Sequence, residues 1–271
     1  MSEASSVLDK FDCYELCVQS PRHIAAFLRA VHGGEPLVLR EDFCGTAALC
    51  RRWAKEALSR GDDGRAVGVD IDSETIDRAA VRAGDEGTRD RIRLVRADVL
   101  DEGAAADVIF VGNFSIGYLH RRADLVRYLC ACRERLARGN AGWGGGVFVC
   151  DTYGGAGAYR LGSLTRRHPG RGREVVHYHW AHEAADPLTG MVENTVSFRV
   201  EIDGEIVSEL PRAFVYRWRL WSIAELREAL AEAGFASSDV YTDVNVAPGE
   251  LPVPSVTLPD EWIVCIAART A

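Results

Sequence analysis

The sequence of 271 residues lacks the features that mark membrane and secreted proteins. No apolar run approaches the roughly 20 residues needed to cross a bilayer, so no membrane segment is expected. The N-terminus has no basic start followed by an apolar stretch, which a secretory signal would require. We therefore expect a cytoplasmic protein.

The sequence also lacks paired cysteine spacings. Its eight cysteines are scattered, mostly inside apolar stretches, and none has the spacing of a zinc site. We expect reduced, buried thiols and no metal site, because such a compartment keeps thiols reduced. The formal net charge of −8 would repel a polyanion, which disfavours nucleic acid as a partner.

Short apolar runs alternate with helical patterns over the first 151 residues. The runs are almost continuously apolar, as in strands covered on both faces of a sheet. The alternation is typical of βαβ units and a parallel sheet. The expected strands are 36–41, 66–70, 92–98, 107–113 and 145–151, and the expected helices are about 21–31, 46–59, 73–84 and 121–138.

The pattern changes between residues 153 and 216, where apolar and polar residues alternate around the hairpin pair Asp203-Gly204. An antiparallel insertion is expected there. A helix should follow, beginning at the capping box of Ser222 and Glu225, and then two more strands. The predicted fold class is α/β: a doubly wound, mostly parallel, seven-stranded Rossmann-like sheet with an antiparallel β insertion after the fifth strand. The core would comprise residues 1–152 and 217–271, the latter with a terminal β-hairpin.

One strand runs into a Gly-containing turn between Leu37 and Leu49, and a helix then begins near Thr46. Backbone N–H groups of such a turn can face a ligand. With Glu41 at the strand end and Cys44-Gly45-Thr46-Ala47 in the turn, the stretch resembles motif I of the class I S-adenosylmethionine-dependent methyltransferases. Phe43 and Ala47 stand where that family usually has glycine.

Acidic and turn residues also follow the next three strands. A carboxylate at Asp70 can accept hydrogen bonds from ribose hydroxyls. The resemblance assigns Asp98 to the adenine amino group, the backbone N–H of Val99 to a ring nitrogen, and the stretch 113–115 to the neighbourhood of the reactive methyl. It also implies that the N-terminal segment folds over the cofactor, S-adenosyl-L-methionine. The expected cofactor-binding residues are Tyr14, Glu41, Gly45, Thr46, Ala47, Asp70, Ile71, Asp98, Val99, Asn113, Phe114 and Ser115.

The resemblance implies a small-molecule methyltransferase that acts on nitrogen or oxygen by in-line displacement, with the insertion as acceptor lid. Strand alternation puts His177 and His179 on one face, where either could act as a base. The alternative is that they are half-exposed strand residues, with Trp180 in a small core. Tyr153, after the fifth strand, is the third catalytic candidate; plain packing is its alternative.

Two arginine clusters suggest an anionic acceptor, and the second of them could instead contact RNA. Arg217 and Arg219 could clamp a carboxylate or phosphate, and the run 166–173 is concentratedly basic. Solvated side chains are the alternative for both. Three other functions stay open: a nicotinamide-dependent oxidoreductase, which the absence of GxGxxG disfavours, an RNA or protein methyltransferase, and a non-catalytic cofactor-binding module. A homodimer is also left open.

Overall fold

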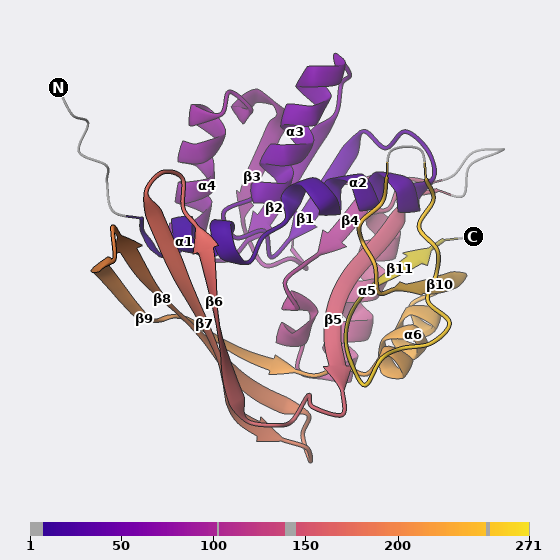
Figure 1. The fold of residues 1–271 in the computed structure, drawn as a ribbon. Helices are drawn as coiled ribbons and strands as arrows, with labels where there is room; N and C mark the ends of the chain where they lie inside the picture. The colour runs from indigo at the N-terminus through magenta and orange to yellow at the C-terminus, as the bar shows by residue number, and fades with distance from the viewer. Residues whose placement is uncertain (1–7, 102, 139–144, 248–249, 271) are drawn as a thin grey trace. The chain divides into compact units, whose positions relative to one another are not determined.

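The computed structural model describes residues 8–101, 103–138, 145–247 and 250–270. The chain forms two compact units (Figure 1). Unit 1 comprises the described part of residues 1–20 together with Tyr159–Arg219. Unit 2 comprises Pro21–Ala158 and Leu220–Ala271. The predicted fold class is confirmed, because a mixed seven-stranded sheet and a separate antiparallel sheet are both present.

Unit 2 contains the seven-stranded sheet, whose strand order is β10-β11-β5-β4-β1-β2-β3. Strands β1 to β5 pair in parallel, whereas β11 is antiparallel to both of its neighbours. The chain order reverses between β1 and β4, and open α/β sheets bind ligands at the carboxyl ends of strands beside such a switch point. The strands are β1 (Val38–Asp42), β2 (Arg65–Asp70), β3 (Ile92–Arg96), β4 (Val108–Val111), β5 (Val147–Gly155), β10 (Ser237–Tyr241) and β11 (Glu261–Arg269).

Helices cover both faces of this sheet (Figure 1). In β5, Phe148 and Cys150 pack in the cluster that holds α5 and α6, whereas Val147 and Val149 pack in the cluster that holds α2 and α3. Period-two alternation explains why a strand between two helical layers must be apolar throughout. The helices are α2 (Pro21–His32), α3 (Ala48–Arg60), α4 (Ser73–Asp85), α5 (Arg122–Arg135) and α6 (Ile223–Glu232), with short 3₁₀ turns η1 (Arg89–Arg91) and η2 (Ser115–Tyr118).

A buried ion pair lies within β1, and hydrogen bonds connect it to α5 and to the loop after β3. Arg40 Nη2 lies 2.7 Å from Asp42 Oδ1, and both side chains are fully buried. The hydroxyl of Tyr128 donates to Asp42 Oδ2 at 2.7 Å. Arg40 and Arg135 both donate to the carbonyl of Val99, at 3.2 and 2.6 Å. Burial raises the pKa of Asp42, which the Arg40 charge and the Tyr128 hydroxyl oppose. These contacts fix the loop after β3 on the core.

Unit 1 contains the antiparallel sheet β6-β7-β8-β9. The predicted hairpin is confirmed: Asp203 and Gly204 have φ of +54° and +88°, as the tight turn between β8 and β9 requires. Helix α1 (Lys10–Cys17) belongs to this unit, and Cys13 shares a hydrophobic cluster with Val176 and Phe198. The sequence pattern placed residues 1–152 in the core and predicted no helix here, whereas the contacts of this helix group it with the inserted sheet. The strands are β6 (Gly162–Pro169), β7 (Glu174–Asp186), β8 (Met191–Ile202) and β9 (Glu205–Arg219).

Several smaller expectations have outcomes as well. The capping box at the start of α6 is confirmed, since Ser222 Oγ accepts from Glu225 N and Glu225 Oε2 accepts from Ser222 N. All eight cysteines are free, and six of them are buried. Among the helices in the described part of the chain, none has the length and apolar character to cross a membrane.

Candidate functional site

The turn between β1 and α3 places three alternate residues in left-handed backbone conformation. Phe43, Gly45 and Ala47 have φ of +56°, +52° and +55°. This conformation costs a residue with a Cβ about 1–2 kcal/mol. The chain therefore keeps the backbone that glycines favour at the two positions where it lacks them. Helix α3 has Ala47 as its N-cap, without a side-chain cap, which corrects the expected start near Thr46.

Carboxylates at the strand ends hold this turn. Asp70 Oδ2 accepts from the backbone N–H of Gly45 at 2.8 Å, and Glu41 Oε2 accepts from that of Cys50 at 3.1 Å. Burial raises the pKa of Glu41 to about 7, and it also raises the pKa of Asp70. Glu41 is 6% exposed, so it braces α3 from inside the core. A Cβ built on Gly45 would meet no atom within 4 Å, which leaves open space beside the turn.

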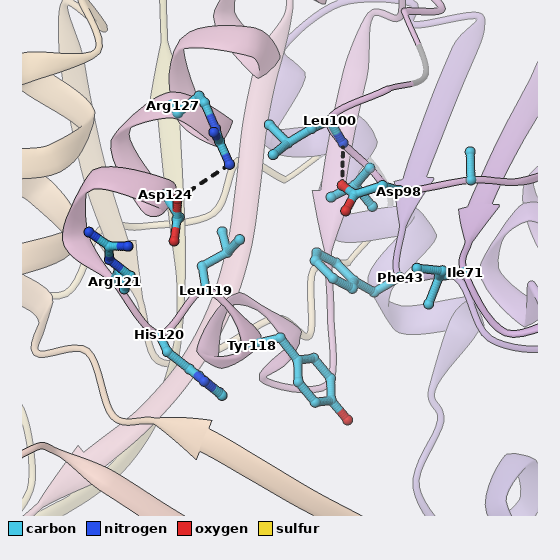
Figure 2. Close-up of a pocket in the computed structure, with 12 residues that line it drawn as sticks. Phe43, Ile71, Asp98, Leu100, Tyr118, Leu119, His120, Arg121, Asp124 and Arg127 are labelled. Atoms are coloured by element: carbon cyan, nitrogen blue, oxygen red, sulfur yellow. Dashed lines mark hydrogen bonds and ion pairs between the residues drawn. The ribbon is translucent and has the colours of Figure 1, made fainter.

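A cavity of about 420 Å³ opens at the carboxyl ends of the strands (Figure 2). Phe43, Ile71 and Asp98 lie on one side of it, and Arg121 and Asp124 from the start of α5 lie on the other. The cavity thus combines apolar surface with two carboxylates, those of Asp98 and Asp124. Its lining comprises Phe43, Ile71, Ala97, Asp98, Val99, Leu100, Tyr118, Leu119, His120, Arg121, Asp124 and Arg127.

Three of the predicted cofactor-binding residues line this cavity: Ile71, Asp98 and Val99. Ile71 is 69% exposed, which makes its side chain available to a flat apolar ligand. Asp98 Oδ1 accepts from the backbone N–H of Leu100 at 2.9 Å (Figure 2). The carboxylate of Asp98 therefore both lines the cavity and stabilises the loop after β3.

The segment after β4 contains two consecutive left-handed residues, Asn113 and Phe114, with φ of +54° and +62°. Asp151 accepts from both of their backbone N–H groups, at 2.9 and 2.6 Å. Ser115 is buried and begins η2. The ring of Tyr153 lies 4.8 Å from that of Phe114. The structure thus brings Tyr153 to the predicted segment 113–115.

The other predicted residues lie in unit 1. Tyr14 in α1 packs against Phe214, with ring centroids 4.9 Å apart. On β7, His177 Nε2 lies 2.6 Å from Glu201 Oε2, and His179 Nδ1 lies 3.0 Å from Thr165 Oγ1. The residues between and after them, Tyr178 and Trp180, pack on the hydrophobic cluster of the sheet, in agreement with the predicted alternation. Within the described ranges, no group of three or more His, Cys, Asp or Glu side chains could hold a metal ion.

Carboxylates neutralise much of the basic run. Arg167 pairs with Glu201, Arg171 with Asp12 and Arg173 with Asp203. In the second cluster, Arg217 Nε lies 2.8 Å from Glu193 Oε2. These pairs are exposed and weak. They favour the alternative of solvated arginines over an anion-binding patch.

Sequence reasoning missed two groups of residues. The first is the far wall of the cavity, which includes Tyr118, His120, Arg121 and Asp124. These residues directly follow the predicted motif after β4, which was the available signal. The second is Asp151, near the end of the fifth predicted strand. Its position matches those of Asp70 and Asp98 in their own strands, but its use of backbone N–H groups is visible only in three dimensions.

Comparison with known proteins shows which solved structures have a similar fold. No protein-family model matches the chain, and no curated protein sequence matches it. Solved structures do match. One is an S-adenosylmethionine-dependent methyltransferase from Clostridium acetobutylicum ATCC 824, with TM-score 0.67 and 19% identity, covering 95% of this chain and 96% of that one.

Two further similar structures are named as methyltransferases of sugars. An amino pentose methyltransferase from Micromonospora echinaspora, with S-adenosylmethionine bound, has TM-score 0.65 and 16% identity, covering 99% of this chain and 100% of that one. A sugar N-methyltransferase from Streptoalloteichus sp ATCC 53650 has TM-score 0.62 and 18% identity, covering 100% and 96%. The chain therefore has the fold of S-adenosylmethionine-dependent methyltransferases.

The left-handed backbone of the turn between β1 and α3 leads to a prediction about stability. Ala47→Gly relieves about 1–2 kcal/mol of backbone strain but removes a buried methyl group worth about 0.8 kcal/mol. We expect the free energy of unfolding, measured by urea denaturation, to stay unchanged or rise by up to about 1 kcal/mol. The matched control is Ala54→Gly, equally buried but inside α3, which should lose roughly 1–2 kcal/mol. Equal losses in the two variants would show that the turn carries no strain.

Proposed function

We propose that this protein is an S-adenosylmethionine-dependent methyltransferase that acts on nitrogen or oxygen of a small-molecule acceptor. The main support is that acidic or turn residues follow four strands at one edge of the sheet, beside a cavity lined by Ile71, Asp98 and Val99. The fold adds support, since the similar structures carry the names of methyltransferases, two of them for sugars.

The residues present fit the cofactor. Asp98 offers a carboxylate to an amino group in a cavity whose wall includes the apolar side chains of Phe43 and Ile71. A carboxylate oxygen can accept more than one hydrogen bond, so Asp70 can receive ribose hydroxyls while it holds Gly45. The open space beside Gly45 suits the methionine portion. When bound, the cofactor supplies a methyl group on a sulfonium, which an in-line nucleophile can take.

The chain's own part in the reaction is to align the acceptor, exclude water and remove a proton where the acceptor requires it. Tyr153 is a candidate because it lies against the segment after β4. His177 and His179 are candidate bases, and residues 153–216 are the candidate acceptor lid. These roles stay predictions, as do a cytoplasmic location and a homodimer.

The competing functions differ in what they require. A nicotinamide-dependent oxidoreductase would need a phosphate-binding glycine loop, whereas the turn after β1 has a single glycine between Phe43 and Ala47. A macromolecular acceptor would favour an unpaired basic surface, but Arg167, Arg171 and Arg173 of the basic run pair with carboxylates. A small-molecule methyltransferase fits both observations best.

The cofactor proposal predicts selective binding. We expect isothermal titration calorimetry to show micromolar affinity for S-adenosylmethionine or S-adenosylhomocysteine and poor affinity for NAD. Asp70→Ala should weaken this binding by about 1–3 kcal/mol, because it removes charge-assisted hydrogen bonds. The control is Asp90→Ala, in the exposed turn before β3, which should bind normally. A reversed preference for NAD would refute the proposal, and unchanged binding in a folded Asp70→Ala variant would remove Asp70 from the site.

The proposed histidine base is tested by activity. Methyl transfer would be followed with labelled S-adenosylmethionine and a panel of amino sugars and small hydroxylated compounds. If either histidine is the base, His177→Ala or His179→Ala should lower the rate by about 10² or more while cofactor affinity stays the same. Full turnover of both variants from pH 6 to 9 would eliminate the histidine base and leave alignment and water exclusion as the mechanism.

A further inference from the structure

The carboxylate of Asp151 accepts two hydrogen bonds from the backbone of another loop. Its Oδ2 accepts from Asn113 N at 2.9 Å, and its Oδ1 accepts from Phe114 N at 2.6 Å. Asp151 lies 38 and 37 residues further along the chain. The contact therefore joins β5 to the segment after β4 at the carboxyl edge of the sheet.

The segment it holds is strained. Asn113 and Phe114 are both left-handed, with φ of +54° and +62°. Such conformations cost of order 1–3 kcal/mol each and persist only where surrounding contacts enforce them. Successive N–H groups in a turn of this kind form a concave anion-binding arrangement. Here the anion is a side chain of the same chain, which offsets the strain.

A second residue of β5 contacts the same segment. Tyr153 is two positions beyond Asp151, so alternation puts both side chains on one side of the strand. Its ring lies 4.8 Å from the ring of Phe114. Beyond Phe114 the chain continues into η2 and reaches Tyr118 and His120 in the wall of the cavity. Loss of the hydrogen bond between Asp151 and Phe114 would therefore be expected to shift residues that line the cavity.

We propose that Asp151 is a positioning residue that must be ionised to hold segment 113–115 in the shape required for methyl transfer. The expected effect on catalysis rests on the proposed function. The two hydrogen bonds that hold the segment do not depend on that proposal. An ionised carboxylate accepts at both oxygens, whereas a protonated one presents an O–H donor toward one of the two N–H groups. Protonation thus removes one hydrogen bond and leaves an unfavourable donor–donor contact.

The buried environment of Asp151 makes its carboxyl group ionise near neutral pH. Burial raises the pKa of Asp151 to about 7, although the two N–H bonds oppose the rise. The charge of Asp151 acts on the thiols of Cys150 on β5 and Cys265 on β11, and burial raises the pKa of both thiols, so they stay neutral. A carboxyl pKa of about 7 means that the hold is half formed at that pH, approaches completion above it and is lost as the pH falls below it.

Amide NMR tests the hold directly, without substrate or cofactor. In ¹⁵N-labelled protein, the amide protons of Asn113 and Phe114 should move together between pH 6 and 8, with a midpoint near 7. In Asp151→Asn these two signals should not titrate, while Asp239→Asn on β10, a matched control in another strand, should behave like the wild type. Amide signals that do not titrate in the wild type, or that titrate unchanged in Asp151→Asn, overturn the proposal.

Activity provides the second readout. The wild-type kcat should fall about tenfold or more from pH 8 to pH 6, whereas kcat of Asp151→Asn should be low at both pH values and nearly independent of pH. The KM for S-adenosylmethionine should change less than kcat, because Ile71, Asp98 and Val99 lie in the loops after β2 and β3, whereas Asp151 holds the segment after β4. A parallel pH dependence in wild type and Asp151→Asn contradicts the positioning role. Failure to bind S-adenosylmethionine would instead refute the proposed function and leave the NMR result standing.

Discussion

Side-chain carboxylates that accept backbone N–H groups hold the loops at the carboxyl edge of the seven-stranded sheet. Asp70 holds the turn after β1, Asp98 holds the loop after β3, and Asp151 holds the segment after β4. Each bond reaches a loop whose shape apolar packing alone would not determine. Left-handed backbone at Phe43 and Phe114 is tolerated beside these contacts. The geometry of the candidate site therefore depends on charged groups, and for two of them, Asp70 and Asp151, burial disfavours the charged form.

The same carboxylates have capacity left for a ligand. An ionised carboxylate has about four acceptor positions, and each of these loops uses one or two of them. Burial raises the pKa values of Glu41, Asp70 and Asp151, because the charged form loses hydration. At Asp70, which is half-buried, a ligand with O–H donors would restore part of that hydration. An edge of this kind suits a nucleoside better than a phosphate-rich dinucleotide.

Much of the fold could be predicted from the sequence because its patterns are local. Continuous apolar runs predicted the covered strands, and Asp203-Gly204 predicted the hairpin. The buried pair of Arg40 and Asp42 could not be predicted, because its stability comes from Tyr128, far along the chain. The association of α1 with the inserted sheet is likewise nonlocal.

The candidate site was predictable in part for the same reason. Residues at the end of an expected strand, such as Asp70 and Asp98, could be found by position alone. Asp151 has the same position but a role that depends on a loop 37 residues earlier in the chain. His120 follows the predicted motif after β4, but only the folded structure shows that it lines the same cavity as Asp98. The order of motifs along the chain thus predicted which edge of the sheet holds the site. Only the folded structure shows which residues line the cavity there.

A crystal structure of the protein with S-adenosylhomocysteine tests the central claim most directly, since it shows which groups the ligand contacts. The account predicts adenine in the cavity beside Phe43 and Ile71, with its amino group within about 3 Å of Asp98 and a ribose hydroxyl at the same distance from Asp70. Ligand bound elsewhere, or this cavity empty at saturating ligand, would contradict it.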